Sequence, residues 1–202
     1  MTYSPIIDIP DGRRLVRVTA ALDAAGLVPP MPNATDYHFA RGTAVHEAVR
    51  LDAAGRLDAK SVHPDVAPYL ESWRAFQRAT RAVTVIAERE VRHESAGYAG
   101  RLDAVMVIGS HLTLVDFKCG APADWHRLQT ALYFLALRTE AVMRPTHRGA
   151  IYLHGDGRIA TFATHPSPAD FADGLRAVQK ARSVLLTPCP ISGKSPPAEG
   201  RS

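Results

Sequence analysis

Residues 97–120, with the sequence GYAGRLDAVMVIGSHLTLVDFKCG, limit the possible fold more than any other segment of the chain. Two apolar runs of strand character flank Gly109-Ser110, a dipeptide suited to a two-residue type II′ hairpin turn. Such a turn places Ile108 opposite His111 and so sets the partner of every other residue in the two strands. The segment therefore predicts a tight antiparallel hairpin within a β-sheet.

This register predicts that three charged side chains share one face of the hairpin. Asp103 lies directly opposite Asp116, with about 4.5–5.5 Å between their Cβ atoms. Lys118 shares that face because strand side chains alternate with a period of two. Facing carboxylates destabilise a sheet, and a divalent cation such as Mg²⁺, which binds hard oxygen ligands, would offset the cost. A three-residue turn would instead place Asp103 opposite Phe117 and remove the pair.

A solvated surface hairpin is the alternative interpretation of the same charges. Asp116 and Lys118 would then form an exposed ion pair at the edge of a sheet, and residue spacing alone does not separate the two interpretations. The segment LTLVDF, residues 112–117, favours burial because it is apolar on both faces, as in a strand covered by other elements.

The composition is that of an ordinary globular protein. The chain has 202 residues, of which 46% are hydrophobic and 22% charged, enough for one domain with a substantial core. We expect a single domain over residues 1–187 and a disordered tail, rich in Pro, Gly and Ser, over residues 188–202. Lys and Arg exceed Asp and Glu by four and the pI is about 9.3, which permits a polyanionic partner such as nucleic acid.

Targeting signals are not evident in the sequence. No run of about 18 apolar residues predicts a membrane span, and the N-terminus lacks the basic and apolar regions of a secretory signal. Cys119 and Cys189, the two cysteines of the chain, offer no disulfide framework and indicate a reducing cytoplasm.

Sequence periodicity predicts an α/β fold with a central mixed sheet flanked by helices. Helical patterns cover residues 18–30 with Thr19 as N-cap, then 34–55, 64–80 and 123–140, and finally 167–185 with Ser167 as N-cap. Strand patterns cover 82–91, 100–108 and 111–118, and 147–164 predicts a hairpin that turns at Gly155-Asp156-Gly157. The first 14 residues read as an extended or loosely packed arm.

Five motifs, in this order, resemble the PD-(D/E)XK nuclease superfamily, most closely its RecB-like branch of phage exonucleases and CRISPR-associated nucleases. They are Gly42-Thr43-Ala44-Val45-His46, Glu88, Gly100-Arg101-Leu102-Asp103, Asp116-Phe117-Lys118, and Gln129 with Tyr133. Each motif alone is weak, and together they span roughly residues 15 to 165. The resemblance implies a restriction-endonuclease-like core.

The resemblance also implies a metal centre that uses Mg²⁺ or Mn²⁺. Asp103 and Asp116 would bind the metal together with the backbone carbonyl of Phe117, and His46 would reach it from its helix. A lone histidine beside apolar residues of a helix is more often structural, which is the competing interpretation of His46. Some members of this branch carry an iron–sulfur cluster on four cysteines, which two cysteines cannot hold.

The resemblance assigns the remaining catalytic roles as well. Lys118 would orient or deprotonate the attacking water and stabilise charge on the phosphate. Gln129 and Tyr133, one helical turn apart, would position the scissile phosphate, although Tyr133 could be a core residue. Glu88 completes the catalytic set, with Glu90 as the alternative on the same strand.

Four side chains near the motifs are candidates for contact with DNA. They are Arg41, Thr43, Arg101 and Arg127. Arginines at the ends of helices and strands are often only solvated. Trp125 could cover the site or simply pack against the core.

The function implied is a Mg²⁺-dependent deoxyribonuclease, with an exonuclease in phage-type recombination, replication or repair as first choice. Its partners would be DNA and a recombination or replication protein, in a cytoplasm (that of the host for a phage protein), and an oligomer is compatible with the sequence. A structure-specific or nicking endonuclease, a non-catalytic binding protein on a decayed nuclease fold, and a phosphatase acting on small substrates are the alternatives.

Overall fold

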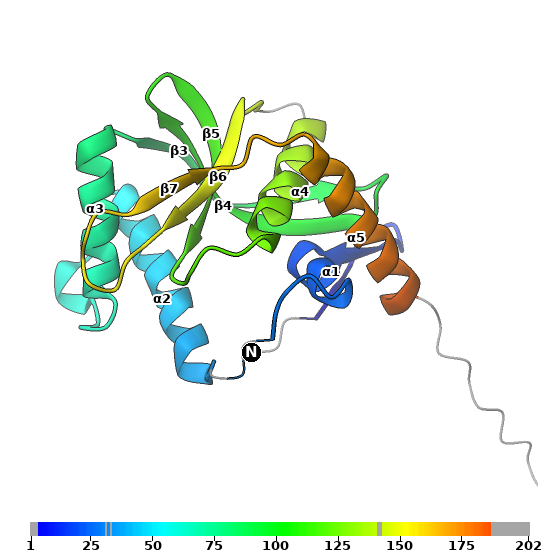
Figure 1. The fold of residues 1–202 in the computed structure, drawn as a ribbon, viewed down its shortest axis with the longest axis horizontal. Helices are drawn as coiled ribbons and strands as arrows, with labels where there is room; N and C mark the ends of the chain where they lie inside the picture. Colours follow the sequence, from blue (N-terminus) through cyan, green and yellow to red (C-terminus); the bar gives the residue numbers. More distant parts are fainter. Residues whose placement is uncertain (1–3, 31, 33, 141–142, 187–202) are drawn as a thin grey trace, which may run out of the picture.

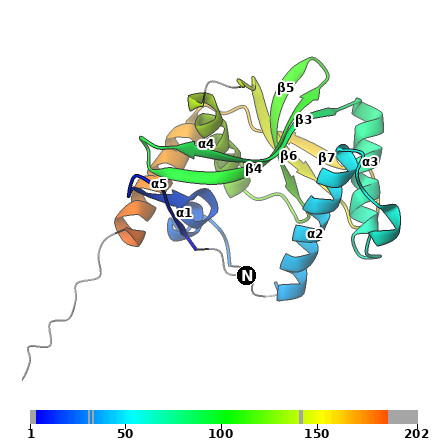
Figure 2. The same ribbon diagram turned by 180° about the vertical axis from the view of Figure 1, so that it is seen from behind.

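The computed structural model describes residues 4–30, 32, 34–140 and 143–186. It confirms an α/β fold with a seven-stranded mixed sheet between helices, shown in Figures 1 and 2. The strands are β1 (Ile6–Asp8), β2 (Arg14–Arg17), β3 (Val83–His93), β4 (Tyr98–Ile108), β5 (His111–Lys118), β6 (His147–Tyr152) and β7 (Thr161–Thr164). The helices are α1 (Val18–Ala24), α2 (Asp36–Ala53), α3 (Ala67–Thr80), α4 (Trp125–Thr139) and α5 (Ala169–Leu185), with a short 3₁₀ helix η1 (Ala59–Ser61).

β4, with 11 residues as long as β3, has three neighbouring strands. β3 pairs antiparallel with it over residues 98–107. On the opposite edge, β2 pairs parallel with residues 98–99 and β5 pairs antiparallel with residues 104–108. β2 and β5 therefore diverge, and residues 100–103 of β4 lack a strand partner on that edge.

Apolar side chains form one layer on each face of the sheet. Leu22, Leu132 and Val178 belong to the layer under α1, α4 and α5, whereas Val45 and Trp73 belong to the layer under α2 and α3. Figures 1 and 2 show the same division of the helices. Side chains from α2 and α4 consequently approach the sheet from opposite faces.

The N-terminal segment differs from the expected loose arm. β1 and β2 form an antiparallel hairpin that extends the sheet, and Ile9, Leu15 and Ala99 form a small apolar cluster beneath it. The expectation was wrong because β1 is only three residues long, too short for a periodic signal.

Both predicted helix caps are also wrong. α1 begins at Val18, so Thr19 lies inside its first turn, and Arg17 occupies the N-cap without a side-chain cap bond. α5 begins at Ala169 after Pro168, so Ser167 lies one residue before the N-cap. In each case the cap was assigned from residue type alone, and the helix starts at a neighbouring position.

The predicted hairpin over 147–164 is present, but neither of its strands reaches the Gly155-Asp156-Gly157 turn. β6 ends at Tyr152 and β7 begins at Thr161, because the connecting loop packs against α3. The His154 backbone N–H donates to the Ser72 hydroxyl at 3.0 Å, and the Ala160 N–H donates to the Ser72 carbonyl at 3.2 Å.

The predicted tail, residues 188–202, lies outside the described residues. Across the described part of the chain, no helix combines the length and apolar character needed to cross a bilayer.

We expect the fold to lose stability in acid because His126 and His165 are buried in their neutral form. Nδ1 of His126 lies 2.9 Å from the Tyr152 hydroxyl. Burial lowers the pKa of His126 to about 3, and burial together with the charge of Arg148 lowers the pKa of His165 to about 4. Unfolded histidine titrates near pH 6.5, so between about pH 6.5 and 4 the unfolded chain binds more protons. Their contribution to stability is complete above about pH 6.5 and is lost progressively toward about pH 4.

Urea unfolding at pH 7.5 and pH 5 measures this loss. We expect each of the two histidines to contribute about 1–2 kcal/mol to the difference in unfolding free energy. The difference should shrink in His126→Asn, which keeps an acceptor near Nδ1, and persist in His63→Asn, where an exposed histidine is replaced. An equal pH dependence in His126→Asn and wild type would refute the assignment.

Candidate active site

The β4–β5 hairpin has the register that the Gly109-Ser110 turn predicts. Ile108 lies opposite His111, Gly109 has a φ of 61°, and Ser110 is not among the described non-glycine residues of positive φ, as a type II′ turn requires. The ladder ends at Ala104 and Val115, so the predicted pairing of Asp103 directly opposite Asp116 is wrong.

The strands change geometry where the pairing ends. Leu102 and Ala104 are two positions apart, yet Leu102 packs in the layer under α4 and Ala104 in the layer under α3. The alternation of β4 therefore reverses around Asp103. On β3, Glu88 has a φ of 52°, a left-handed conformation that costs a non-glycine residue on the order of 1–3 kcal/mol. Glu88 and Asp103 thus occupy an irregular position in both strands.

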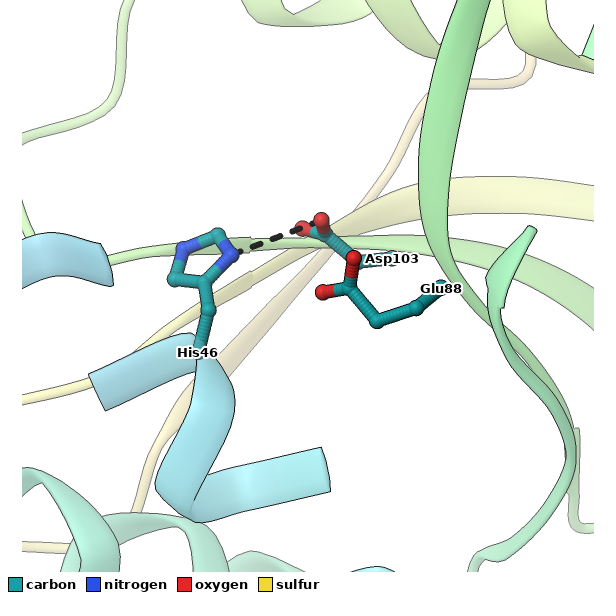
Figure 3. A group of neighbouring side chains, drawn as sticks. All are labelled: His46, Glu88 and Asp103. Carbon is teal, nitrogen blue, oxygen red and sulfur yellow. Dashed lines mark ion pairs between the residues drawn. The ribbon is translucent and has the colours of Figure 1, made fainter. Parts of the chain in front are cut away.

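Glu88, Asp103 and His46 of α2 form a cluster of possible metal ligands. One ligand atom from each lies within 4.8 Å of the others. Nδ1 of His46 is 3.4 Å from Oδ1 of Asp103, the contact drawn as a dashed line in Figure 3, where the Glu88 carboxylate points toward the same pair. Three elements that are far apart in sequence, α2, β3 and β4, each contribute one ligand.

The three side chains of the cluster influence one another electrostatically. Burial lowers the pKa of His46, but the Asp103 carboxylate overcomes this and raises it well above its usual value. Burial raises the pKa of Asp103, but the charge of His46 overcomes it and lowers the pKa. Burial and the charge of Asp103 both raise the pKa of Glu88. His46 and Asp103 therefore form an ion pair, and Glu88 lies beside it in a position that disfavours a further negative charge.

A second polar group lies on the α4 side of the hairpin. Nζ of Lys118 is 2.6 Å from Oδ2 of Asp116 and donates to Oε1 of Gln129 at 2.7 Å. Nε2 of Gln129 donates to the Tyr133 hydroxyl at 3.2 Å. The same ammonium lies 4.8 Å from the centre of the Trp125 ring. α4 therefore contacts the Asp116–Lys118 pair through Gln129 and Trp125, and Tyr133 continues the hydrogen-bond chain from Gln129.

Asp116 is an unusual carboxylate within this group. Burial raises its pKa to about 6, with a further contribution from Asp103 that Lys118 opposes. Its Oδ2 atom has no hydrogen-bond partner of acceptable geometry among the described residues, so the close contact with Lys118 is electrostatic. A buried oxygen without a hydrogen bond is costly unless another ligand satisfies it.

The gap in the sheet brings the two groups together. The Phe117 N–H donates to Oδ2 of Asp103 at 2.7 Å, which joins Asp103 to the strand that carries Asp116 and Lys118. Because residues 100–103 lack a strand partner on this edge, side chains from both layers meet there. The Phe117 carbonyl as a metal ligand stays a prediction.

A cleft of about 690 Å³ opens over the His46 cluster. Its walls include Thr43, Arg50 and Arg101, and Glu88 and Asp103 also line it. An acidic cluster beside two arginines suits a phosphate that approaches together with a cation.

The comparison with known families decides what kind of protein this is. The family model of the PD-(D/E)XK nuclease superfamily matches residues 20–192. The chain belongs to the PD-(D/E)XK nuclease superfamily. No curated protein matches its sequence.

Solved structures to which this chain is similar include an alkaline exonuclease, LHK-Exo from Laribacter hongkongensis. It is 14% identical, with 85% of this chain and 88% of that chain covered and a TM-score of 0.47. The structure of SSO0001 is 15% identical, with 84% of each chain covered and a TM-score of 0.37.

The donor set of this PD-(D/E)XK protein fits a divalent metal ion. Carboxylate oxygens and an imidazole nitrogen, as in Glu88, Asp103 and His46, suit Mn²⁺, and the carboxylates also suit Mg²⁺. Asp116, predicted as a metal ligand, lies outside this three-residue cluster, and its Oδ2 contacts Nζ of Lys118 at 2.6 Å. Sequence reasoning placed Glu88 among the catalytic residues, and the structure adds that it lies with His46 and Asp103.

The four predicted DNA contacts of the PD-(D/E)XK protein separate into two pairs. Thr43 and Arg101 line the cleft. Arg41 and Arg127 do not: the Arg41 guanidinium lies 5.3 Å from the ring centre of Tyr69, and Arg127 pairs with Asp170 on α5. Contact of Arg41 and Arg127 with DNA elsewhere on the surface stays a prediction.

Sequence reasoning missed Arg50, which lines the cleft and pairs with Glu47. The signal was its position four residues after His46, since residues with this spacing share a helix face.

Proposed function

We propose that this protein is a metal-dependent deoxyribonuclease that hydrolyses phosphodiester bonds in DNA. The observation that supports this best is the meeting, at the gap in the sheet, of the His46–Glu88–Asp103 cluster and the Asp116–Lys118 pair. Gathering partly buried carboxylates beneath a cleft costs free energy, which a bound cation would offset. Membership of a nuclease superfamily agrees with this assignment.

His46, Glu88 and Asp103 would hold the metal ion, and Asp116 would add a further oxygen. When bound, Mg²⁺ or Mn²⁺ supplies Lewis-acid polarisation of the phosphate and lowers the pKa of a bound water. Each carboxylate also repels phosphate when no cation is present, so DNA should bind productively only after the metal.

Lys118 would stabilise the negative charge that develops on the phosphate. An ammonium has three N–H donors, and Gln129 accepts one of them at 2.7 Å. With Asp116 also 2.6 Å from Nζ, a donor that neither Gln129 nor Asp116 engages would reach the attacking water or a phosphate oxygen. Gln129 thereby positions Lys118, and Tyr133 in turn holds the Gln129 amide.

An exonuclease that acts in phage-type recombination, replication or repair with a protein partner is the more specific form of the proposal. It rests on the motif resemblance. A structure-specific or nicking endonuclease would use the same residues, because the bond cleaved and the chemistry are the same.

Cleavage of linear and covalently closed circular duplex DNA tests both levels. With Mg²⁺ or Mn²⁺ we expect linear DNA to be degraded, circular DNA to remain intact, and EDTA to stop the reaction. Nicking of the circle would favour the endonuclease alternative. Absence of cleavage of any DNA with either metal, or hydrolysis only of a small chromogenic phosphate ester, would refute the proposed deoxyribonuclease.

A further inference from the structure

Arg101 lies beside the metal-ligand cluster, paired with two glutamates of β3. It is directly opposite Glu90 in the β3–β4 ladder. Its guanidinium lies 3.4 Å from the Glu88 carboxylate and 3.9 Å from that of Glu90, and its side chain is 58% exposed. These distances exceed the 2.7–2.9 Å that is typical of a charge-assisted hydrogen bond. Arg101 is therefore held loosely, between two acceptors.

Glu88 belongs to two interactions that compete for its charge. Its carboxylate is one of the three groups in the His46–Glu88–Asp103 cluster, and it is also a partner of Arg101. Figure 3 shows this carboxylate pointing toward His46 and Asp103. A divalent cation bound there would take up the negative charge of Glu88 and would repel the guanidinium a few ångströms away. Both effects weaken the hold of Glu88 on Arg101.

Arg101 lies where its guanidinium can turn into either of two cavities once Glu88 releases it. The side chain lines the cleft over the cluster and also a second cavity of about 720 Å³, which Arg17, Arg92 and Tyr133 line as well. An extended DNA strand that crosses the cluster would pass Arg101, because this side chain lines both the cleft and the second cavity. A half-exposed arginine at their boundary can therefore turn toward a phosphate without a change in the backbone.

We propose that Arg101 couples metal binding to nucleic-acid binding, as a positioning residue that exchanges Glu88 and Glu90 for a DNA phosphate when a cation occupies the cluster. This inference rests on the proposed function. By linkage the coupling is reciprocal, so DNA also tightens metal binding. The protein without metal is thereby kept from holding DNA that it cannot cleave.

Fluorescence anisotropy with labelled DNA measures the coupling without cleavage if Ca²⁺ serves as the metal and the reference contains EDTA at equal ionic strength. In wild type we expect Ca²⁺ to tighten DNA binding about ten-fold, and in Arg101→Gln by less than about three-fold. Glu90→Gln should act from the other side, because it frees Arg101 and tightens binding in EDTA. Arg14→Gln is the matched control: this arginine is 51% exposed, pairs with Asp8 at 3.5 Å and lines neither of the two cavities, so the ratio should stay as in wild type.

Calorimetric titration with Mn²⁺ in the absence of DNA gives a second readout. Arg101→Gln should bind Mn²⁺ a few-fold more tightly, on the order expected from loss of a competing surface ion pair. Equal Ca²⁺ ratios in wild type and Arg101→Gln, or weaker Mn²⁺ binding by the variant, would overturn the inference even if DNA is cleaved. Intact coupling without any cleavage would support it while rejecting the proposed hydrolysis.

Discussion

Lys118→Ala should lower the rate constant for DNA cleavage by about 10²–10³-fold, as removal of one preorganised charge from a transition state does elsewhere. Nζ of Lys118 is the cationic group closest to Asp116, with a contact of 2.6 Å, and Gln129 holds it in place at 2.7 Å. Its loss removes a donor that is already oriented before the substrate arrives. Single-turnover cleavage of end-labelled DNA measures this effect on the chemical step.

Two further measurements separate catalysis from folding in this variant. Lys118→Ala leaves Asp116 buried without its cation, and the pKa of Asp116, already raised to about 6 by burial, should rise further. The carboxyl group would then be protonated, so the fold should persist by circular dichroism. Mn²⁺ should still bind through His46, Glu88 and Asp103. Lys60→Ala in η1 is the matched control for loss of a lysine, and equal rates for both variants would exclude a catalytic role of Lys118.

Asp170→Ala should destabilise the protein by about 3–5 kcal/mol, because it leaves a buried arginine without its counter-ion. Asp170 is 1% exposed and Arg148 is 5% exposed, with 2.7 Å between Nη2 and Oδ2. Arg148 also donates to the backbone carbonyls of Arg127 and Ser167, so it joins β6 to α4 and α5. Without Asp170 the guanidinium cannot reach water and has no other acid beside it among the described residues.

Urea unfolding at pH 7.5 measures the cost of this substitution. Asp173→Ala is the matched control, since Asp173 lies one turn further along α5, is 33% exposed and pairs with the exposed Arg176. We expect that control to cost about 0–1 kcal/mol. Replacing Arg148 by methionine together with Asp170→Leu should recover part of the loss. A similar cost for Asp170→Ala and Asp173→Ala would show that the buried pair is not what holds α5 in place.

Local patterns were sufficient for the hairpin that carries half of the candidate site. The type of turn depends on Gly109-Ser110 alone, and a tight turn sets the register of both strands. The placement of Lys118 beside Asp116 followed from the period of a strand, and that of Gln129 and Tyr133 on one face followed from the period of a helix.

Long-range packing decided the other half of the site. Nothing in the local sequence shows that His46 of α2 and Glu88 of β3 meet Asp103, because their convergence depends on which helix covers which face. The break in strand pairing at residues 100–103 arises where β2 and β5 diverge along one edge of β4. The same packing determines that Arg101 and Arg50 line the cleft, whereas Arg127 forms an ion pair with Asp170 away from it.

The amino-acid sequence by itself determined the fold class, the tight bend between β4 and β5, and the family to which the chain belongs. These depend on residues that are neighbours along the chain or repeat with a fixed period. Only the tertiary structure decided which charges share one cavity, because electrostatic contacts form between side chains that folding brings together from both layers of the sheet.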